Sequence, residues 1–132
     1  ITIVLDACFS GKSIGGNLIT AVSGGPGTMT SPIYDDSNKP LQRDDVLIFA
    51  SANGDEWSNW YSEKRHGLFT YFFLKGLRGE ADQNLDKTIS ASELDLYIRD
   101  KSTGVPYYAR LAGKEQTPVT MGDTARVVVR LK

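Results

Sequence analysis

Two continuous apolar runs constrain the fold of this chain more than any other feature of its sequence. The first is Ile1-Thr2-Ile3-Val4-Leu5, and the second is Val46-Leu47-Ile48-Phe49-Ala50-Ser51-Ala52. Both are apolar along their length, and neither alternates between apolar and polar positions. Runs of this kind are typical of strands that are covered on both faces of a sheet. We therefore predict two buried strands of a largely parallel sheet.

The rest of the pattern adds helices and a third strand. Apolar residues between positions 66 and 77 fall on one helical face. Ser90-Ala91-Ser92-Glu93 forms a capping box, which predicts a helix that ends near Arg99. Residues 102–122 have an irregular pattern, and residues 125–131 predict an edge strand. The order of elements predicts an α/β fold whose central sheet is mainly parallel and flanked by helices.

Composition excludes several classes of function. The 132 residues carry 15 basic and 16 acidic side chains, for a net charge of −1. This balance gives no electrostatic basis for binding nucleic acid or an anionic membrane surface. No apolar run approaches the roughly 20 residues that a membrane-spanning helix needs. We expect a cytoplasmic protein without nucleic-acid or membrane partners.

Cysteine chemistry is limited to one residue. Cys8 is the only cysteine and His66 the only histidine, so an intrachain disulfide and a cysteine-cluster zinc site are excluded. Cys8 follows the first predicted strand, and reactive groups of open α/β sheets gather at the carboxyl ends of strands. A thiol held there can act as a nucleophile beside backbone N–H donors. The alternative is that Cys8 is a small buried apolar residue.

Four stretches carry a resemblance to a known family. Val-Leu-Asp-Ala-Cys-Phe-Ser-Gly at positions 4–11 resembles the nucleophile motif of the caspase–metacaspase superfamily of cysteine peptidases, in its bacterial caspase-like branch. Residues 50–58, 66–72 and 116–119 resemble later segments of the same branch in order and spacing. The resemblance implies a partial caspase-like (caspase–hemoglobinase) sandwich. On this basis residues 1–132 would be the C-terminal part of one peptidase domain. The many glycines and prolines of residues 12–45 separately predict a long mobile loop there.

The resemblance also implies an activity and its site residues. Cys8 would attack the substrate carbonyl as a cysteine-type endopeptidase nucleophile, and the chemistry would need no cofactor. Asp6, with Asp55 and Ser51, would bind a substrate Arg or Lys immediately before the scissile bond. The family's catalytic histidine lies upstream of the nucleophile strand, so the missing N-terminal half of the domain would be a required partner. The chain by itself is expected to be inactive.

Other interpretations of these residues stay open. His66-Gly67 resembles a non-catalytic helix start of the family, although histidine follows cysteine in papain-like enzymes. Asp6 can equally bond to backbone at a strand end, and Asp55 can be a solvated loop charge. The alternative function is a non-catalytic caspase-like module that scaffolds assemblies or recognises peptides.

A possible calcium loop lies before the second predicted helix. Residues 82–93 resemble an EF-hand loop, with oxygen ligands at its characteristic spacing. The ligands would be Asp82, Asn84, Asp86, Ser90 and Glu93, together with the Thr88 carbonyl. Lys87 replaces the usual glycine and adds a positive charge. The alternative is a surface loop followed by a helix cap. Calcium is therefore a possible cofactor, and a calcium-responsive binding module is a further possibility.

Overall fold

The computed structural model describes residues 1–6, 12–13, 16–17, 46–53 and 56–132. Its strands are β1 (Thr2–Leu5), β2 (Lys12–Ser13), β3 (Gly16–Asn17), β4 (Leu47–Ala50), β5 (Trp60–Tyr61), β6 (His66–Gly67), β7 (Thr88–Ser90), β8 (Val119–Met121) and β9 (Val127–Arg130). Its helices are α1 (Leu68–Lys75), α2 (Ala91–Ile98) and α3 (Val105–Leu111), with a π-helical turn over Gly76–Glu80 directly after α1. The structure therefore confirms that the chain combines strands and helices, as the predicted α/β class requires.

The central sheet has the strand order β1-β4-β8. β1 and β4 are parallel, with Ile3 opposite Ile48, and β8 runs antiparallel to β4, with Phe49 opposite Thr120. The sheet is therefore mixed, and the prediction of a mainly parallel sheet is wrong because β8 is antiparallel. β8 lies within the segment predicted to be irregular. It was missed because it is short and half-buried throughout, so it carries no strong apolar signal.

The two predicted strands differ in burial. All four residues of β4 are buried, as its continuous apolar run predicts. β1 instead lies at the edge of the described sheet, where Ile3 is 36 % and Val4 45 % exposed. Successive side chains of a strand point to opposite faces, so both faces of β1 are accessible. The prediction that β1 is covered on both faces is wrong for the part of the chain that the structure describes.

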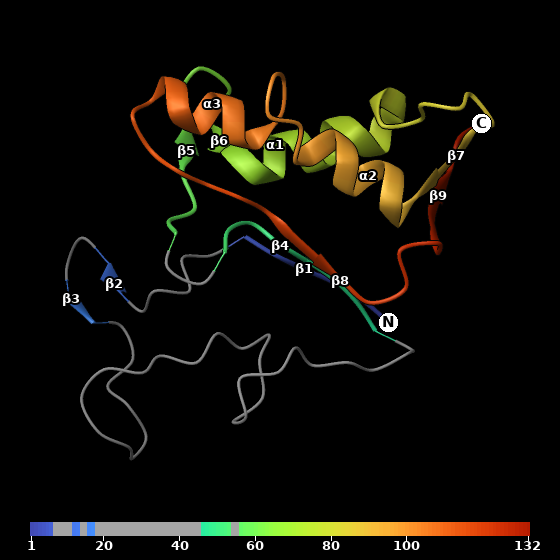
Figure 1. Cartoon of the computed structure of the whole chain (residues 1–132), viewed down its shortest axis with the longest axis horizontal. Helices are drawn as coiled ribbons and strands as arrows, with labels where there is room; N and C mark the ends of the chain where they lie inside the picture. Colours follow the sequence, from blue (N-terminus) through green and yellow to red (C-terminus); the bar gives the residue numbers. More distant parts are fainter. Residues whose placement is uncertain (7–11, 14–15, 18–45, 54–55) are drawn as a thin grey trace, which may run out of the picture.

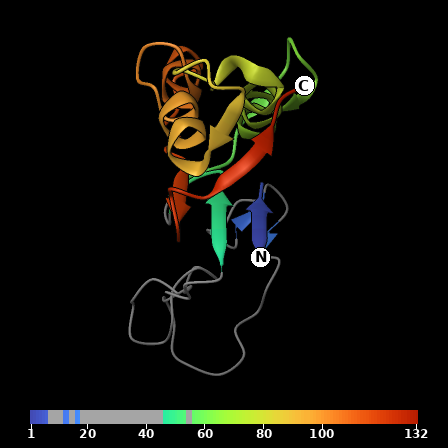
Figure 2. The same cartoon turned by 90° about the vertical axis from the view of Figure 1, so that its right-hand side faces the viewer.

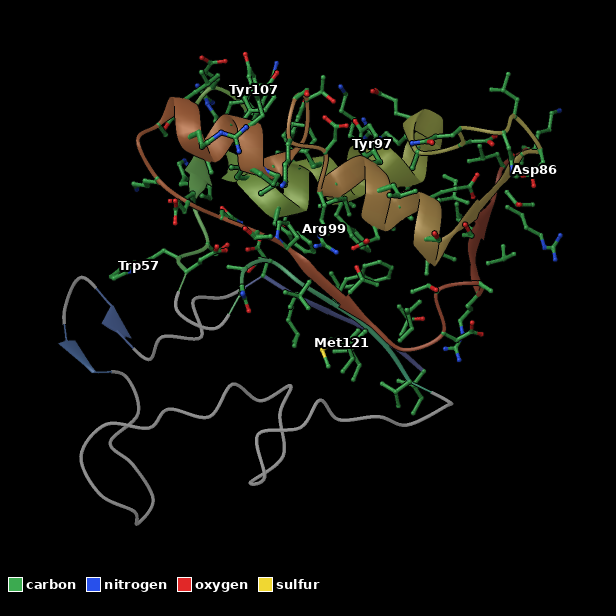
Figure 3. All side chains as sticks on the ribbon, viewed as in Figure 1. Trp57, Asp86, Tyr97, Arg99, Tyr107 and Met121 are labelled. Carbon is green, nitrogen blue, oxygen red and sulfur yellow. The ribbon has the colours of Figure 1, made fainter. Side chains whose placement is uncertain are left out.

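The main core lies between the sheet and the helices. Figures 1 and 2 show α1, α2 and α3 on the same face of the β1-β4-β8 sheet. The largest fully buried apolar side chains come from β4, α1, β7, α2 and α3: Leu47, Phe49, Phe69, Ile89, Leu94, Ile98 and Val105. A smaller cluster around Ile48 and Ala50 lies on the other face, where Met121 also points (Figure 3). Burying both faces of β4 makes it the centre of the fold.

The capping box predicted for the second helix is confirmed. The Glu93 backbone N–H donates to Ser90 Oγ at 3.2 Å, and the Ser90 backbone N–H donates to Glu93 Oε2 at 2.9 Å. α1 begins two residues later than predicted because His66 and Gly67 pair with β5. α3 was not predicted, although Pro106 in its first turn is a recognised helix-start signal. No helix in these described segments is long and apolar enough to cross a membrane.

The last predicted strand is confirmed as β9, but it does not join the central sheet. It pairs antiparallel with β7, with Ile89 opposite Val129. This two-stranded sheet holds the end of the predicted calcium loop, because the Leu131 backbone N–H donates to the Lys87 carbonyl at 2.8 Å. At the other end of the chain, β2 and β3 form an antiparallel pair within the segment predicted to be a loop. The rest of the 12–45 prediction lies outside the described residues.

Candidate functional site

An exposed carboxylate follows β1 and is held by residues from two distant segments. Asp6 Oδ1 accepts a hydrogen bond from the Ser58 hydroxyl, and Asp6 Oδ2 accepts one from the Thr70 hydroxyl. Ser58 precedes β5, and Thr70 lies in the first turn of α1. Both hydroxyls donate to the carboxylate, so they restrict its orientation. In the described residues no basic side chain forms an ion pair with Asp6.

Gly67 completes this cluster by its lack of a side chain. A Cβ atom placed on Gly67 would overlap the Asp6 carboxylate, so the backbone of β6 packs directly against it. This close approach favours glycine at position 67, because any side chain there would displace the Asp6 carboxylate. The neighbouring His66 is exposed, and α1 has no side-chain cap at its N-terminus. The structure therefore places the only histidine of the chain one residue from a glycine that contacts Asp6.

A buried polar network connects the segments that follow β4. Gln116 is 1 % exposed and bridges two of them. Its Oε1 accepts from the backbone N–H of Asn59 at 2.8 Å and from Asn59 Nδ2 at 3.0 Å. Its Nε2 donates to the Ser51 carbonyl at 2.9 Å. Because buried polar groups need partners, this network determines how the 51–59 segment lies against the approach to β8.

Glu56 makes the second connection between these segments. Its carboxylate accepts from the Thr117 backbone N–H, and its Oε1 accepts from the Thr117 hydroxyl at 3.0 Å. The Asn53 backbone N–H also donates to Glu56 Oε2, at 3.4 Å. Together with the Asp6 contacts to Ser58 and Thr70, these hydrogen bonds connect all four stretches that carry the family resemblance.

The predicted site residues have different outcomes. Asp6 is an exposed residue and lies in the hydroxyl cluster described above. Ser51 is fully buried, and its backbone N–H donates to the Leu5 carbonyl at 2.9 Å. It joins β1 to the buried network, and a contact with substrate stays a prediction. Cys8 and Asp55 lie outside the described residues.

Sequence reasoning missed the residues that position Asp6. Ser58, Thr70 and Gly67 lie in stretches that carry the family resemblance, but no contact was predicted for them. The sequence offers only the residue types as a hint: hydroxyl side chains can donate to carboxylates, and glycine allows the backbone to approach closely. Asp6 lies 52 residues from Ser58 and 64 residues from Thr70 in the sequence. Only the fold brings them together.

The predicted calcium loop has several hydrogen bonds of its own. Lys87 adopts a left-handed conformation with φ 64°, and its backbone N–H donates to Asp82 Oδ2 at 3.1 Å. The other oxygen of this carboxylate, Asp82 Oδ1, is buried without a hydrogen-bond partner. The hydroxyl and backbone N–H of Thr88 lower the pKa of Asp86. The loop therefore presents carboxylate oxygens around a turn that would ordinarily use glycine.

The carboxylates of this loop do not converge on one point. No group of three or more His, Cys, Asp or Glu side chains is placed to hold a metal ion among the described residues. Glu93 instead bonds Ser90 in the capping box. The residues fit calcium in part: the unpaired Asp82 oxygen favours a cation, but Glu93 would have to leave Ser90 to become a ligand. Calcium binding stays a prediction.

Titration calorimetry tests calcium binding at this loop. We expect weak saturable binding, with a Kd of about 10⁻⁴–10⁻³ M, because the cation must displace Glu93 and approach Lys87. Asp82→Ala should abolish the heat of binding. Lys87→Gly should strengthen binding, since it removes both the nearby positive charge and the left-handed strain. No heat of binding with the unmodified chain would contradict the prediction.

Comparison with known proteins adds no further assignment. No family model, no curated protein and no solved structure matches this chain. A proposal for the function therefore rests on the fold, the site geometry and the motif resemblance.

Proposed function

We propose that this chain carries the nucleophile and part of the substrate pocket of a caspase-like cysteine endopeptidase that cleaves after Arg or Lys. The observation that carries the proposal is the Asp6 carboxylate. It belongs to an exposed residue, is hydrogen-bonded by two hydroxyls, and lies two residues before Cys8 in the sequence. A carboxylate fixed in this way is suited to a guanidinium or ammonium group of a substrate.

The surrounding network supports this proposal. Ser58 and Thr70 each occupy one Asp6 oxygen, and each carboxylate oxygen has a second lone pair for a substrate cation. Gln116 and Glu56 in turn hold the segment that contains Ser58. A pocket built this way is preorganised, which reduces the entropy lost when the substrate binds.

In the proposed reaction the Cys8 thiolate attacks the substrate carbonyl carbon. The peptide C–N bond breaks, and the amine leaves with a proton from a histidine that an upstream segment supplies. Water then hydrolyses the thioester, releasing the carboxylic acid and regenerating the thiol. Within this reaction, the described residues Asp6, Ser58 and Thr70 would position the substrate. Within the described residues β1 lies at the edge of the sheet, which is compatible with a further strand from the upstream segment, because sheet edges can accept strands.

Asp6→Asn tests the proposed specificity in protein expressed from the complete reading frame. We expect kcat/KM for Arg peptides to fall about 100-fold, because the substrate cation loses its charged partner. Thr70→Val should give a smaller loss of about tenfold, since Asp6 keeps its charge but loses one orienting hydroxyl. The measurement is hydrolysis of matched peptides with Arg or citrulline before the scissile bond. Equal losses on both peptides would contradict the role of Asp6.

A non-catalytic module is the second candidate. The exposed apolar side chains of Ile3 and Val4, and the position of β1 at the edge of the described sheet, favour it, because edge strands with accessible side chains bind peptides or partner chains. This candidate predicts that full-length protein binds Arg peptides without cleaving them. Mass spectrometry of the peptide after incubation separates the two outcomes.

A further inference from the structure

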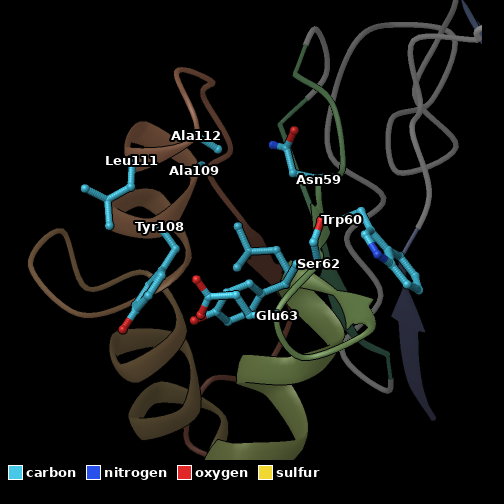
Figure 4. A pocket seen from close by; sticks show the side chains of 10 residues that line it. Asn59, Trp60, Ser62, Glu63, Tyr108, Ala109, Leu111 and Ala112 are labelled. Carbon is cyan, nitrogen blue, oxygen red and sulfur yellow. The ribbon is translucent and has the colours of Figure 1, made fainter.

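A second pocket lies on the helix side of the β5–β6 hairpin. It encloses about 290 Å³ between the hairpin and α3. Tyr61 of β5 and Leu68, the first residue of α1, line it on one side. Tyr108 and Ala109 of α3, with Ala112 at the end of that helix, line it on the other side (Figure 4). Asp6 is not among its lining residues, so this pocket is separate from the cluster described above.

Part of the pocket wall is apolar and continuous with the core. Leu68 is 3 % exposed and Ala109 is fully buried. The Tyr61 and Tyr108 rings lie 5.4 Å apart between centroids, and Tyr108 also packs on Phe72 at 5.2 Å. Because these rings are part of a packed aromatic cluster, their positions are set before any ligand binds. The pocket is therefore preformed.

One acidic group gives the pocket its charge. Glu63 is the only charged side chain that lines it, and Figure 4 shows its carboxylate on the side that faces Tyr108. Within the part of the chain that the structure describes, Glu63 forms no ion pair. Burial, the nearby Tyr108 and the Glu63 charge together raise the pKa of Tyr61, so this phenol is neutral near pH 7. The pocket thus combines neutral aromatic walls with one negative charge.

We propose that this pocket binds an arginine side chain of a peptide. The aliphatic stem of arginine would lie along Leu68, and its planar guanidinium would stack on Tyr108 and pair with Glu63. Aromatic faces attract cations, and a guanidinium matches a carboxylate with two parallel hydrogen bonds. Lysine has neither the flat face nor the forked donors, so it should bind less tightly.

Two exposed apolar side chains extend the pocket into a peptide-sized surface. Trp60 is 66 % and Leu111 is 67 % exposed, and Figure 4 places them on opposite sides of the pocket. Aromatic and apolar anchors beside a pocket are typical of protein-binding surfaces. They would contact the residues that flank the bound arginine. This proposal does not depend on the peptidase activity.

Backbone-amide NMR of the 132-residue chain tests the proposal. The probes are N-acetyl-arginine amide and its neutral isostere, N-acetyl-citrulline amide. We expect saturable shifts at Trp60, Ser62 and Ala112 with arginine, and about fivefold weaker binding of citrulline. Glu63→Gln should weaken arginine binding about fivefold, while Glu115→Gln, an exposed acid outside the pocket, should change it less than twofold.

A second variant tests the pocket without changing its charge. Ala112 is exposed at the end of α3, so Ala112→Leu should preserve the fold while narrowing the pocket and abolishing the shifts at Trp60. Shifts confined to Asp6, Ser58 and Thr70 would overturn this proposal while supporting the peptidase pocket. Equal binding of citrulline and arginine, or the absence of saturation, would also overturn it.

Discussion

Cys8→Ala is expected to abolish peptide hydrolysis by the full-length protein, with a loss of about 10⁴-fold or more in kcat. Removing a covalent nucleophile leaves only binding and oxyanion stabilisation, and losses of this size are typical. The same variant should lose labelling by an Arg-directed thiol-reactive probe. Peptide hydrolysis and labelling are measured on purified wild-type and variant proteins side by side. Equal labelling of both proteins would contradict the nucleophile assignment.

His66→Ala is the comparison variant for the Cys8→Ala experiment. His66 is exposed, and it neighbours the glycine that packs on Asp6. If an upstream histidine is the base, His66→Ala should keep activity within about tenfold of the wild type, because it removes no reacting group. A loss as large as that of Cys8→Ala would instead assign the base to His66. The two variants together therefore separate the two possible sources of the catalytic histidine.

Gln116→Met is expected to lower the free energy of unfolding by about 3–5 kcal/mol. Methionine is similar in length but offers no comparable donor or acceptor, so the Asn59 backbone N–H and the Ser51 carbonyl would lose their hydrogen bonds to Gln116, whereas Asn59 Nδ2 keeps its bond to the Trp57 carbonyl. Each buried polar group left unsatisfied costs about 1–3 kcal/mol. Urea denaturation of the purified chain, followed by circular dichroism, measures the change.

The control for this variant is Gln83→Met. Gln83 is exposed in the 82–93 loop, so its replacement should change stability by less than about 0.5 kcal/mol. If both variants unfold at the same urea concentration, the buried network does not contribute as proposed. A loss in Gln116→Met would also loosen β5, because the Asn59 carbonyl accepts the hydrogen bond that holds the Leu68 backbone N–H at 2.8 Å.

Local patterns predicted the elements whose stability is local. The capping box before α2 appears as expected, because both of its hydrogen bonds join residues three apart. The apolar run of β4 predicted a buried strand, and all four of its residues are buried. α1 was predicted from the helical spacing of Phe69, Phe72 and Phe73, which all lie in the core. In these cases the interactions that decide the structure lie within one helix turn or one strand.

The wrong predictions concern which strands pair and which elements cover one another. β8 was missed because its pairing with β4, rather than its own residues, makes it a strand. The run in β1 predicted a strand correctly but not its exposure, because apolar sequence indicates burial only when a neighbour covers it. β9 was predicted as an edge strand, but its partner is β7. Strand partners are chosen by tertiary packing, so a single sequence leaves them open.

The sequence alone determined the α/β class, the positions of β1, β4, α1 and α2, and the acidic residue before Cys8. The tertiary structure decided that Asp6 meets Ser58, Thr70 and the backbone of Gly67, and that Gln116 holds Asn59 and Ser51. The physical reason is the range of the interactions. Helix propensity and apolar spacing act between near neighbours, whereas the site forms only when the sheet and α1 bring distant residues together.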